Sequence, residues 1–365
     1  MVTRREVAQR AGTSDALISY VLNGGPRGVA DGTRERILRA IDELGYRPNA
    51  VARSLRMSRT MTIGLVVPDN SNPFFAELGR ALEDVAFDAG YTLLLGNAMD
   101  DPEREAAYVR SMIDRQVDGL IVAPATDSAR WIAELAGTSI ARVMLDRDLD
   151  VPDAAHVLVD NDGGAYAATT HLLGHGARRI ACVAGPAHVS SARERAAGWR
   201  RALHDAGHRA DTELVAQAPF GRAHGYHAGH RLLSMDDRPD AVFVGSDEQA
   251  VGVLRAAADL GVRVPDDLAI CSFDGVEAGA FTMPTLTTMR QPFELIGRRA
   301  VGWIAEKVAD PGLAPMRLRY DTTLVRRGSC GCPDRSHDEP EPPPADRPVR
   351  TAGSTTREDQ EEGRQ

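Results

Sequence analysis

The sequence predicts an all-α helix-turn-helix domain at the amino terminus, followed by a two-lobed α/β body with Rossmann-like parallel sheets. Residues 1–60 carry apolar side chains at helical spacing around a central glycine. From residue 61 onward, compact apolar runs alternate with amphipathic segments, which is typical of parallel strands covered by helices. Charge also separates the two regions: residues 1–60 hold eleven Arg and six Asp or Glu (11 − 6 = +5), which leaves −9 − 5 = −14 for the remainder.

The helix-turn-helix is expected in residues 6–23, EVAQRAGTSDALISYVLN. Gly12 lies at the turn, and Ala8 and Ile18 have the spacing of the motif on either side of it. Ser14 is the expected N-cap of the second helix, and Asp15 beside it suits the positive end of that helix. The other apolar positions repeat at helical spacing and are expected to share one core: Val7, Ala11, Leu17, Val21 and Leu22.

A third helix is expected at residues 33–44, ended by Gly45. Its expected core face consists of Ile37, Leu38, Ile41 and Leu44. Residues 50–56, AVARSLR, resemble a further helix, but two turns are too short to be stable alone. This segment therefore needs a partner surface.

The body alternates strands and helices in order along the chain. Apolar strand patterns lie at residues 61–68, 91–96, 117–124, 141–147, 179–186, 240–247 and 268–275. Helical patterns lie at residues 74–90, 102–116, 127–137, 162–173, 190–207, 225–234 and 249–261. The chain is expected to cross into a second lobe near residues 156–160, and residues 286–308 are expected to lead back to the first.

Four stretches closely resemble the LacI/GalR family of transcription regulators: EVAQRAGTSDALISYVLNG, TRERILRAIDELGYRPN, ARSLR and TIGLVVPDNSNPFFAEL. The likeness continues to about Cys332. It implies a helix-turn-helix head and an effector domain that is similar to periplasmic binding proteins. The implied function is sequence-specific transcriptional repression, controlled by a small-molecule effector, a sugar or sugar derivative, bound between the lobes. The implied partners are a pseudo-palindromic double-stranded operator and a second copy of the chain.

This resemblance sets the expected domain bounds. Residues 1–48 form the DNA-binding head, and residues 49–60 form a hinge helix and linker. Residues 61–332 form the effector-binding and dimerisation domain, with lobe 1 at about 61–158 and 291–325 and lobe 2 at about 159–290. Residues 333–365 are rich in proline and charge and nearly free of apolar residues, so an acidic disordered tail is expected.

By resemblance, Asp15, Ala16 and Tyr20 reach base edges in the major groove. Asp15 suits a cytosine amine and Ala16 a thymine methyl group; Asp15 as a mere helix-terminus residue remains the alternative. Phosphate contacts, which position the head without specifying sequence, are expected from Thr3, Ser14, Ser19, Asn23 and Arg34. Ala30 stands where the family usually has serine, so Asp31 or Thr33 is expected to cap the third helix.

The resemblance also implies that the hinge folds against DNA. Leu55 is expected to enter the minor groove at a central base step and kink the duplex, with Asn49 and Ala52 against the groove beside it. A ligand that shifts the two lobes would then control whether the hinge is ordered.

Polar and aromatic side chains follow the predicted strands, at the edge where open parallel sheets bind ligands. The resemblance supports the same positions as effector contacts. Carboxylate, amide and guanidinium groups suit hydroxyls, and aromatic rings suit the apolar face of a sugar. Asp69 and Asn72 as turn residues, Arg195 as a surface residue and Asp274 as a turn residue remain alternatives. The candidates are Asn70, Asn72, Phe74, Phe75, Asp146, Arg147, Arg195, Phe220, Ser246, Asp247, Asp274 and Gln291.

Other classes of protein fit the sequence less well. A transporter's solute-binding protein would share the two-lobed body, but it would need an export signal and no basic head. Phosphate loops, nucleophile elbows and the HExxH motif are missing, so no catalytic residue is expected. With no apolar signal or spanning segment in the sequence, the expected location is the cytoplasm.

No cofactor or metal is expected. Cys330-Gly-Cys332 offers two thiols that can bind a metal or oxidise, but no second pair accompanies it in the sequence, so a structural or incidental role is the interpretation and those two remain the alternatives. His224, His227 and His230 are three residues apart and share a helix face only loosely. Cys182 and Cys271 lie in apolar runs and are expected to be inert core residues.

Overall fold

The structure is a computed structural model that describes residues 2–23, 29–47, 59–125 and 130–333. The chain divides into two compact units, Met1–Thr60 and Met61–Gln365. Asn49, Ala52 and Leu55, together with the expected hinge helix, lie outside the described residues, as do residues 334–365 of the expected tail. Among the helices that the structure describes, none has the length and apolar character of a membrane span.

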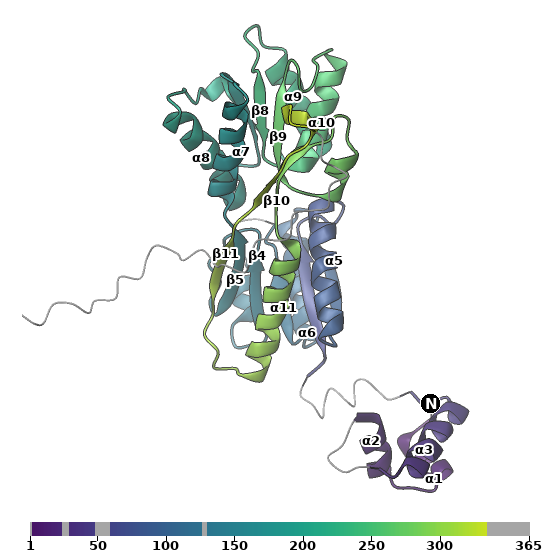
Figure 1. Cartoon of the computed structure of the whole chain (residues 1–365). Coiled ribbons are helices and arrows are strands. Elements are labelled where there is room, and N and C mark those ends of the chain that lie inside the picture. The colour runs from purple at the N-terminus through teal and green to yellow at the C-terminus, as the bar shows by residue number, and fades with distance from the viewer. Residues whose placement is uncertain (1, 24–28, 48–58, 126–129, 334–365) are drawn as a thin grey trace, which may run out of the picture. The chain divides into compact units, whose positions relative to one another are not determined.

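The amino-terminal unit packs helices α1 (Arg4–Ala11), α2 (Asp15–Asn23) and α3 (Asp31–Leu44) around a small core (Figure 1). Ile18 and Ile37 are fully buried at its centre. Gly12 ends α1 in the left-handed region at φ +63°, where a residue with a side chain would be strained. The predicted helix-turn-helix is therefore present.

Two expectations about α3 are wrong. Leu38 is 50% exposed, because it lies about 100° around the helix from Ile37 and faces solvent. The core face is instead Ile37, Ala40, Ile41 and Leu44. Neither Asp31 nor Thr33 caps the helix: it starts after Ala30 without a side-chain cap, and the Thr33 hydroxyl accepts a hydrogen bond from Arg36 at 3.2 Å.

The first sheet of the larger unit is entirely parallel in its pairings, in the order β11-β5-β4-β3-β1-β2. Its strands are β1 (Thr62–Val67), β2 (Thr92–Asn97), β3 (Gly119–Val122), β4 (Ala141–Leu145), β5 (Ala154–Val159) and β11 (Arg317–Tyr320). Helices α5 (Pro73–Asp88), α6 (Pro102–Asp114) and α11 (Phe293–Ala309) cover it (Figure 1). Residues 127–137, expected to form an α-helix, contain the 3₁₀ helix η1 (Arg130–Leu135).

The second sheet has the order β12-β10-β9-β8-β6-β7. Its strands are β6 (Ile180–Ala184), β7 (Val215–Gln217), β8 (Ala241–Val244), β9 (Ala269–Asp274), β10 (Thr287–Arg290) and β12 (Thr323–Val325). Helices α7 (Asn161–Gly174), α8 (Ser190–Asp205), α9 (Arg222–Leu233) and α10 (Asp247–Asp259) pack on it (Figure 1). We name each sheet with its helices the first and second lobe.

The chain passes between the lobes after β5, after β10 and between β11 and β12. Residues 291–325 were expected in the first lobe, but β12 within this range pairs antiparallel with β10 in the second sheet. The segment after β12 contains the 3₁₀ helix η4 (Gly328–Cys330), and its Ser329 donates a hydrogen bond to Ile270 of the second sheet. Another 3₁₀ helix, η3 (Glu277–Phe281), follows β9. These three crossings join the lobes. Residues that follow the carboxyl ends of strands in both lobes line a shared cavity.

Candidate functional site

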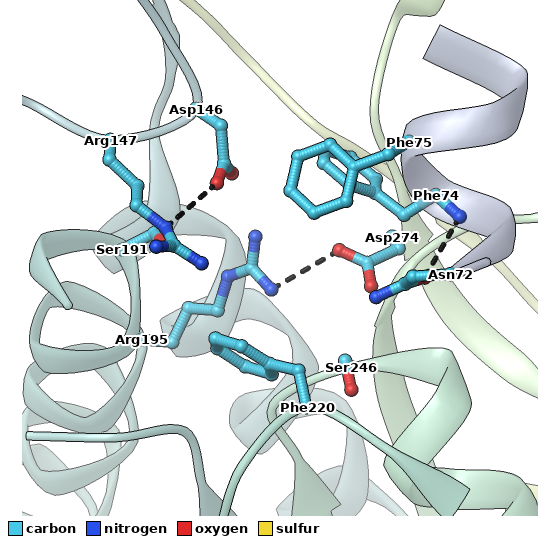
Figure 2. A pocket seen from close by; sticks show the side chains of 10 residues that line it. All are labelled: Asn72, Phe74, Phe75, Asp146, Arg147, Ser191, Arg195, Phe220, Ser246 and Asp274. Atoms are coloured by element: carbon cyan, nitrogen blue, oxygen red, sulfur yellow. Dashed lines mark hydrogen bonds and ion pairs between the residues drawn. The ribbon is translucent and has the colours of Figure 1, made fainter. Parts of the chain in front are cut away.

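A cavity of about 290 Å³, open solvent included, lies where strands of both lobes end. Figure 2 shows charged, amide and aromatic side chains converging on it from the two lobes. Its lining residues are Asn72, Phe74, Phe75, Asp146, Arg147, Ser191, Arg195, Phe220, Ser246 and Asp274. Such a mixture of apolar rings and a few polar groups is typical of small-molecule sites.

The start of α5 supplies the apolar wall of the first lobe. Asn72 is the N-cap of this helix, and its Oδ1 accepts a hydrogen bond from the backbone N–H of Phe74 at 3.0 Å. That cap points the first turn at the cavity. Phe74 and Phe75 then pack edge to face, with ring centroids 4.8 Å apart.

The end of β4 supplies two opposite charges. Asp146 lies in the left-handed region at φ +59°, and its Oδ2 is 3.6 Å from Nε of Arg147. Nη1 of Arg147 donates to the carbonyl of Pro124 at 2.7 Å and to that of Ala125. These bonds hold a buried guanidinium at the edge of the cavity.

Arg195, on α8, is the central residue of the second-lobe wall. It is 4% exposed, and its guanidinium stacks over the ring of Phe273 at 3.9 Å. Nε donates to Oδ1 of Asn161 at 2.8 Å, and Nη1 donates to the carbonyl of Gly245 at 2.6 Å and to Oδ1 of Asp274 at 3.2 Å. Among the described residues, Nη2 has no partner, which leaves it available to a ligand.

Asp274 faces Arg195 at the end of β9. Burial raises the pKa of this carboxyl to about 8, although the guanidinium of Arg195 acts in the opposite direction. Its Oδ1 also accepts a hydrogen bond from Nε2 of Gln291 at 3.0 Å. Because the pKa is high, a ligand that donates to Asp274 or stabilises its charge would change its protonation.

Nine of the twelve expected effector residues line the cavity, and three do not. The Asn70 amide pairs with Asn97, whose Nδ2 donates to its Oδ1 at 2.7 Å. Asp247 is buried and accepts from the hydroxyls of Ser272 and Thr288 and from two backbone N–H groups. Gln291 contacts the lining residue Asp274 instead.

Asp69 and Ser191 also differ in whether they line the cavity. The Asp69 carboxylate accepts from the backbone and hydroxyl of Ser71, as the turn alternative requires. Ser191 lines the cavity but was not expected there. Its signal was present in the sequence, because a serine in the first turn of a helix after a buried strand points to the ligand-binding edge of the sheet.

The second candidate surface is the exposed side of α2. Asp15 and Ala16 are exposed in its first turn, and Ser19 and Tyr20 lie one turn later, away from the buried Ile18. Ser14 caps the helix as expected, since its Oγ accepts a hydrogen bond from the N–H of Leu17 at 3.4 Å. Asn23 is the last residue of α2.

Thr3 and Arg34, both expected at phosphates, are exposed. Thr3 also forms a capping box with Glu6: its Oγ1 accepts from the Glu6 N–H at 3.4 Å, and its own N–H donates to Oε2 at 2.6 Å. Its hydroxyl is therefore partly used within α1.

Both parts of the chain have matches among known proteins. Residues 3–49 match the model of bacterial regulatory proteins of the lacI family, and residues 169–330 match a periplasmic binding protein-like domain. The chain is 37% identical to the HTH-type transcriptional repressor PurR of Erwinia tasmaniensis over 331 residues, which covers 90% of this chain and 97% of that protein. The PurR of Aliivibrio salmonicida is 33% identical over 311 residues, 85% of this chain and 93% of the relative.

Two solved structures are similar over most of the chain. The transcriptional regulator CelR in complex with cellobiose is 31% identical with a TM-score of 0.68, covering 90% of this chain and 100% of that one. The lac repressor dimer bound to operator and the anti-inducer ONPF is 26% identical with a TM-score of 0.80, covering 90% and 99%. The helix-turn-helix, the paired parallel sheets and this similarity along nearly the whole chain show that the protein belongs to the lacI family of bacterial transcription regulators.

Proposed function

We propose that this regulator is a repressor that binds a pseudo-palindromic operator as a homodimer and responds to a sugar or sugar derivative. The main support for a bound effector is the cavity, whose wall combines Arg195 and Asp274 from the second lobe with Asp146 and the Phe74 ring from the first. A ligand there contacts both lobes at once, so its binding free energy depends on how the lobes are arranged.

For the DNA-binding end, we infer that α2 enters the major groove. Asp15, Ala16 and Tyr20 would face base edges: Ala16 and Tyr20 lie on the side of α2 opposite to the buried Ile18, and Asp15 is exposed in the first turn. Ser14, Ser19, Thr3, Asn23 and Arg34 would position the head on phosphates. The lac repressor, similar over 90% of this chain, is a dimer bound to operator, which supports the same arrangement here.

For the effector, hydrogen-bonding groups and aromatic faces together fit a carbohydrate. Two similar regulators have been solved with cellobiose and with ribose, which supports this ligand class. Because Phe74 and Phe220 would also accept a planar ring, the test should include nitrogen heterocycles as well as sugars. We infer no catalytic role for the cavity, so a bound sugar should be recovered unchanged.

For the coupling, we propose that the lobe arrangement controls residues 49–60 as a hinge, with Leu55 in the minor groove. The effector can shift operator affinity only by its difference in affinity for the two lobe arrangements, typically about 1–3 kcal/mol, or roughly 5- to 150-fold. The sign of that shift distinguishes an inducer from a co-repressor.

The experiment is an operator-binding titration with the full chain. A randomised-DNA selection first supplies the preferred site, and fluorescence anisotropy then measures its affinity with and without each compound of a panel of sugars and nucleobases. We expect one sugar to change operator affinity at least fivefold and to bind the wild type in calorimetry. If the protein has a preferred DNA site but responds to nucleobases alone, the effector is a nucleobase and not a sugar. If it has no preferred DNA site, the result would point to a solute-binding protein.

A further inference from the structure

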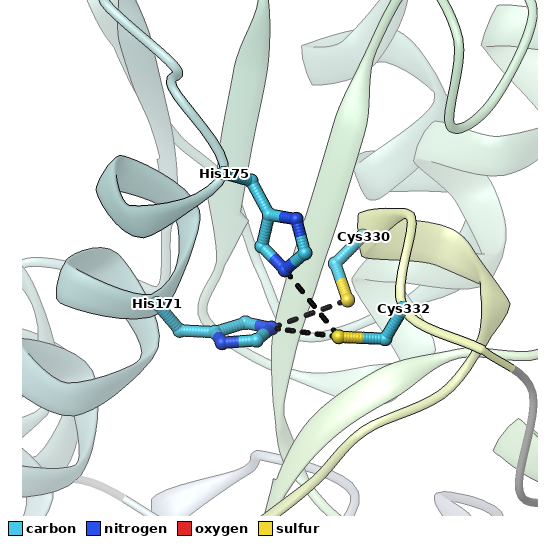
Figure 3. A group of neighbouring side chains, drawn as sticks. All are labelled: His171, His175, Cys330 and Cys332. Atoms are coloured by element: carbon cyan, nitrogen blue, oxygen red, sulfur yellow. Dashed lines mark hydrogen bonds between the residues drawn. The ribbon is translucent and has the colours of Figure 1, made fainter.

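Four side chains outside the cavity converge on one point of the second lobe (Figure 3). His171 and His175 are four residues apart at the end of α7, so they share one face of the helix. Cys330 is the last residue of η4 and Cys332 follows two residues later, and His171 and Cys330 are 159 residues apart in sequence. From the sequence, only the cysteine pair stands out and no metal is expected, because nothing in the sequence indicates that these histidines are adjacent to it.

Three distances between the donor atoms are close to those around a tetrahedral ion. Nε2 of His171 lies 3.2 Å from Sγ of Cys330 and 3.7 Å from Sγ of Cys332, and Nε2 of His175 lies 3.3 Å from Sγ of Cys332. The potential ligand atoms of all four residues lie within 4.8 Å of one another. A tetrahedral zinc ion with bonds of ~2.0 Å to nitrogen and ~2.3 Å to sulfur separates its ligands by about 3.3–3.8 Å.

We propose that His171, His175, Cys330 and Cys332 form a structural site for Zn²⁺. A set of two imidazoles and two thiolates in tetrahedral arrangement selects zinc over harder cations such as Mg²⁺ or Ca²⁺. All four positions are filled by protein, which is the pattern of a structural site and leaves no open position for a substrate.

Charge and access both suit this ion. Binding of Zn²⁺ forms two Zn–S and two Zn–N bonds and releases two thiol protons to solvent, so two thiolates balance the charge of the ion. The neutral product is compatible with a site in which Cys330 is buried and His171 and Cys332 are half-buried. His175 is exposed, which gives the ion a path of entry.

The protein holds the cysteine segment in place by other bonds. Oγ of Ser329 donates to the carbonyl of Ile270 at 2.8 Å, and the N–H of Arg327 donates to Oγ1 of Thr287 at 2.8 Å. Gly331 has φ +88° between the two cysteines, a conformation that lets this one-residue spacing present both thiols to α7. The ion would therefore fasten the segment after β12 to α7, across the edge of the second sheet.

The test uses the full chain, purified under a thiol reductant, loaded with Zn²⁺ and passed through chelator-treated buffer. We expect one Zn²⁺ per chain by elemental analysis and a higher Tm than for the chelated protein. Co²⁺ in place of Zn²⁺ should give the visible bands of a tetrahedral ion together with thiolate-to-cobalt charge transfer. This spectrum requires no substitution, so it tests the site even if a variant folds poorly.

The variants assign the ligands. Cys332→Ser and His175→Ala should each lose most of the bound Zn²⁺ and the cobalt–thiolate band. Cys182→Ala, at a buried cysteine outside the cluster, and His204→Ala, at a histidine that is 89% exposed, should keep one ion. The proposal is overturned if wild-type protein with reduced thiols binds no Zn²⁺ and shows no cobalt–thiolate band, which would leave thiol–imidazole hydrogen bonds alone. The proposal is also overturned if Cys332→Ser and His175→Ala both retain as much Zn²⁺ as the wild-type protein.

Discussion

Arg195 joins the cavity to the core of the second lobe through three acceptors and an aromatic face. Its bonds to Asn161, Gly245 and Asp274 are all internal to the lobe, while Nη2 remains for a ligand. In the proposed effector site, one side chain would therefore serve both packing and recognition. Different substitutions of Arg195 should remove its contribution to stability and its contribution to ligand binding.

We predict that Arg195→Lys keeps the fold but loses the effector response, because an ammonium ion cannot reproduce the planar fork of donors. Arg195→Ala should also destabilise the body, by about 3 kcal/mol, the low end for breaking a buried pair, because burial already favours the neutral form of Asp274 and little uncompensated charge is left. Calorimetry and urea unfolding measure the two effects. Arg193→Ala, an exposed position on the same helix, is the matched control; a normal response of Arg195→Lys would remove the residue from the proposed site.

Asp15 tests the DNA-facing side of α2. We predict that Asp15→Asn changes the preferred base at one position of each half-site, because an amide can donate where a carboxylate only accepts. A randomised-operator selection reads this directly. If the preferred sequence is unchanged and only helix stability falls by a few tenths of a kcal/mol, Asp15 acts at the helix terminus alone.

At the scale of elements, one ion-pair network bridges the two lobes. Arg319 on β11 makes two hydrogen bonds to Glu194 on α8, at 3.1 and 3.0 Å, and lies 3.4 Å from Asp148 after β4. The backbone N–H of Asp148 also donates to Oγ of Ser190 at 2.9 Å. These contacts belong to one arrangement of the lobes, so they should contribute to the equilibrium between arrangements.

We predict that Arg319→Met changes effector affinity several-fold while lowering global stability by less than about 1 kcal/mol, as for other partly exposed ion pairs. The expected cause is a shift in the lobe equilibrium. Arg299→Met is the control, because the contacts of Arg299 with Glu306 within α11 and with Met316 before β11 both stay inside the first lobe. Equal effector affinity in the two variants would show that the bridge is not coupled to binding.

Asp148 makes the same network sensitive to acid. The imidazole of His156, 3.4 Å away, and the guanidinium of Arg317 hold the pKa of Asp148 at about 2, although partial burial raises it. The folded-state pKa is thus below the unfolded value of about 3.9, so this contribution to stability is present above pH ~4 and is lost as pH falls toward 2.

We predict that the stability difference between wild type and Asp148→Asn is largest near pH 6 and shrinks by pH 3. Urea midpoints at the two pH values measure it. A difference that does not change with pH would mean that the Asp148 carboxylate is not stabilised by its charged neighbours.

At the scale of the whole molecule, the chain separates charge between its two units. Residues 1–60 carry +5 (eleven Arg against six Asp or Glu), while the full chain has a net charge of −9. The acidic body limits non-specific attraction to DNA, and the basic residues concentrate it at the helix-turn-helix.

We predict that operator affinity falls steeply between 50 and 200 mM salt, by about 10³-fold or more if the dimer contacts six or more phosphates. Effector binding in the cavity should change little over the same range, because its charges are buried and screened weakly. Anisotropy and calorimetry at each salt concentration give the comparison. Parallel losses of both affinities would contradict the separation of the two sites.

Much of the site could be predicted because parallel strands bring their carboxyl ends to one edge. Asn72, Asp146, Phe220, Ser246 and Asp274 follow predicted strands or turns, and all of them line the cavity. The sequence does not reveal which way each side chain turns. Asp247 is adjacent to Ser246, yet it points into the lobe and binds backbone N–H groups.

Short stretches of the chain are enough to predict the helix-turn-helix, the alternation of strands and helices, and the basic head, because helical and strand periodicity and charge are local properties. Where distant segments meet becomes visible in the folded chain alone. The pairing of β12 with β10 and the meeting of His171 with Cys330 depend on the closure of long loops, which no short stretch encodes. The sequence predicts the cavity because every parallel strand of a sheet ends at the same edge. The proposed zinc site forms only when the chain returns to the second lobe at β12.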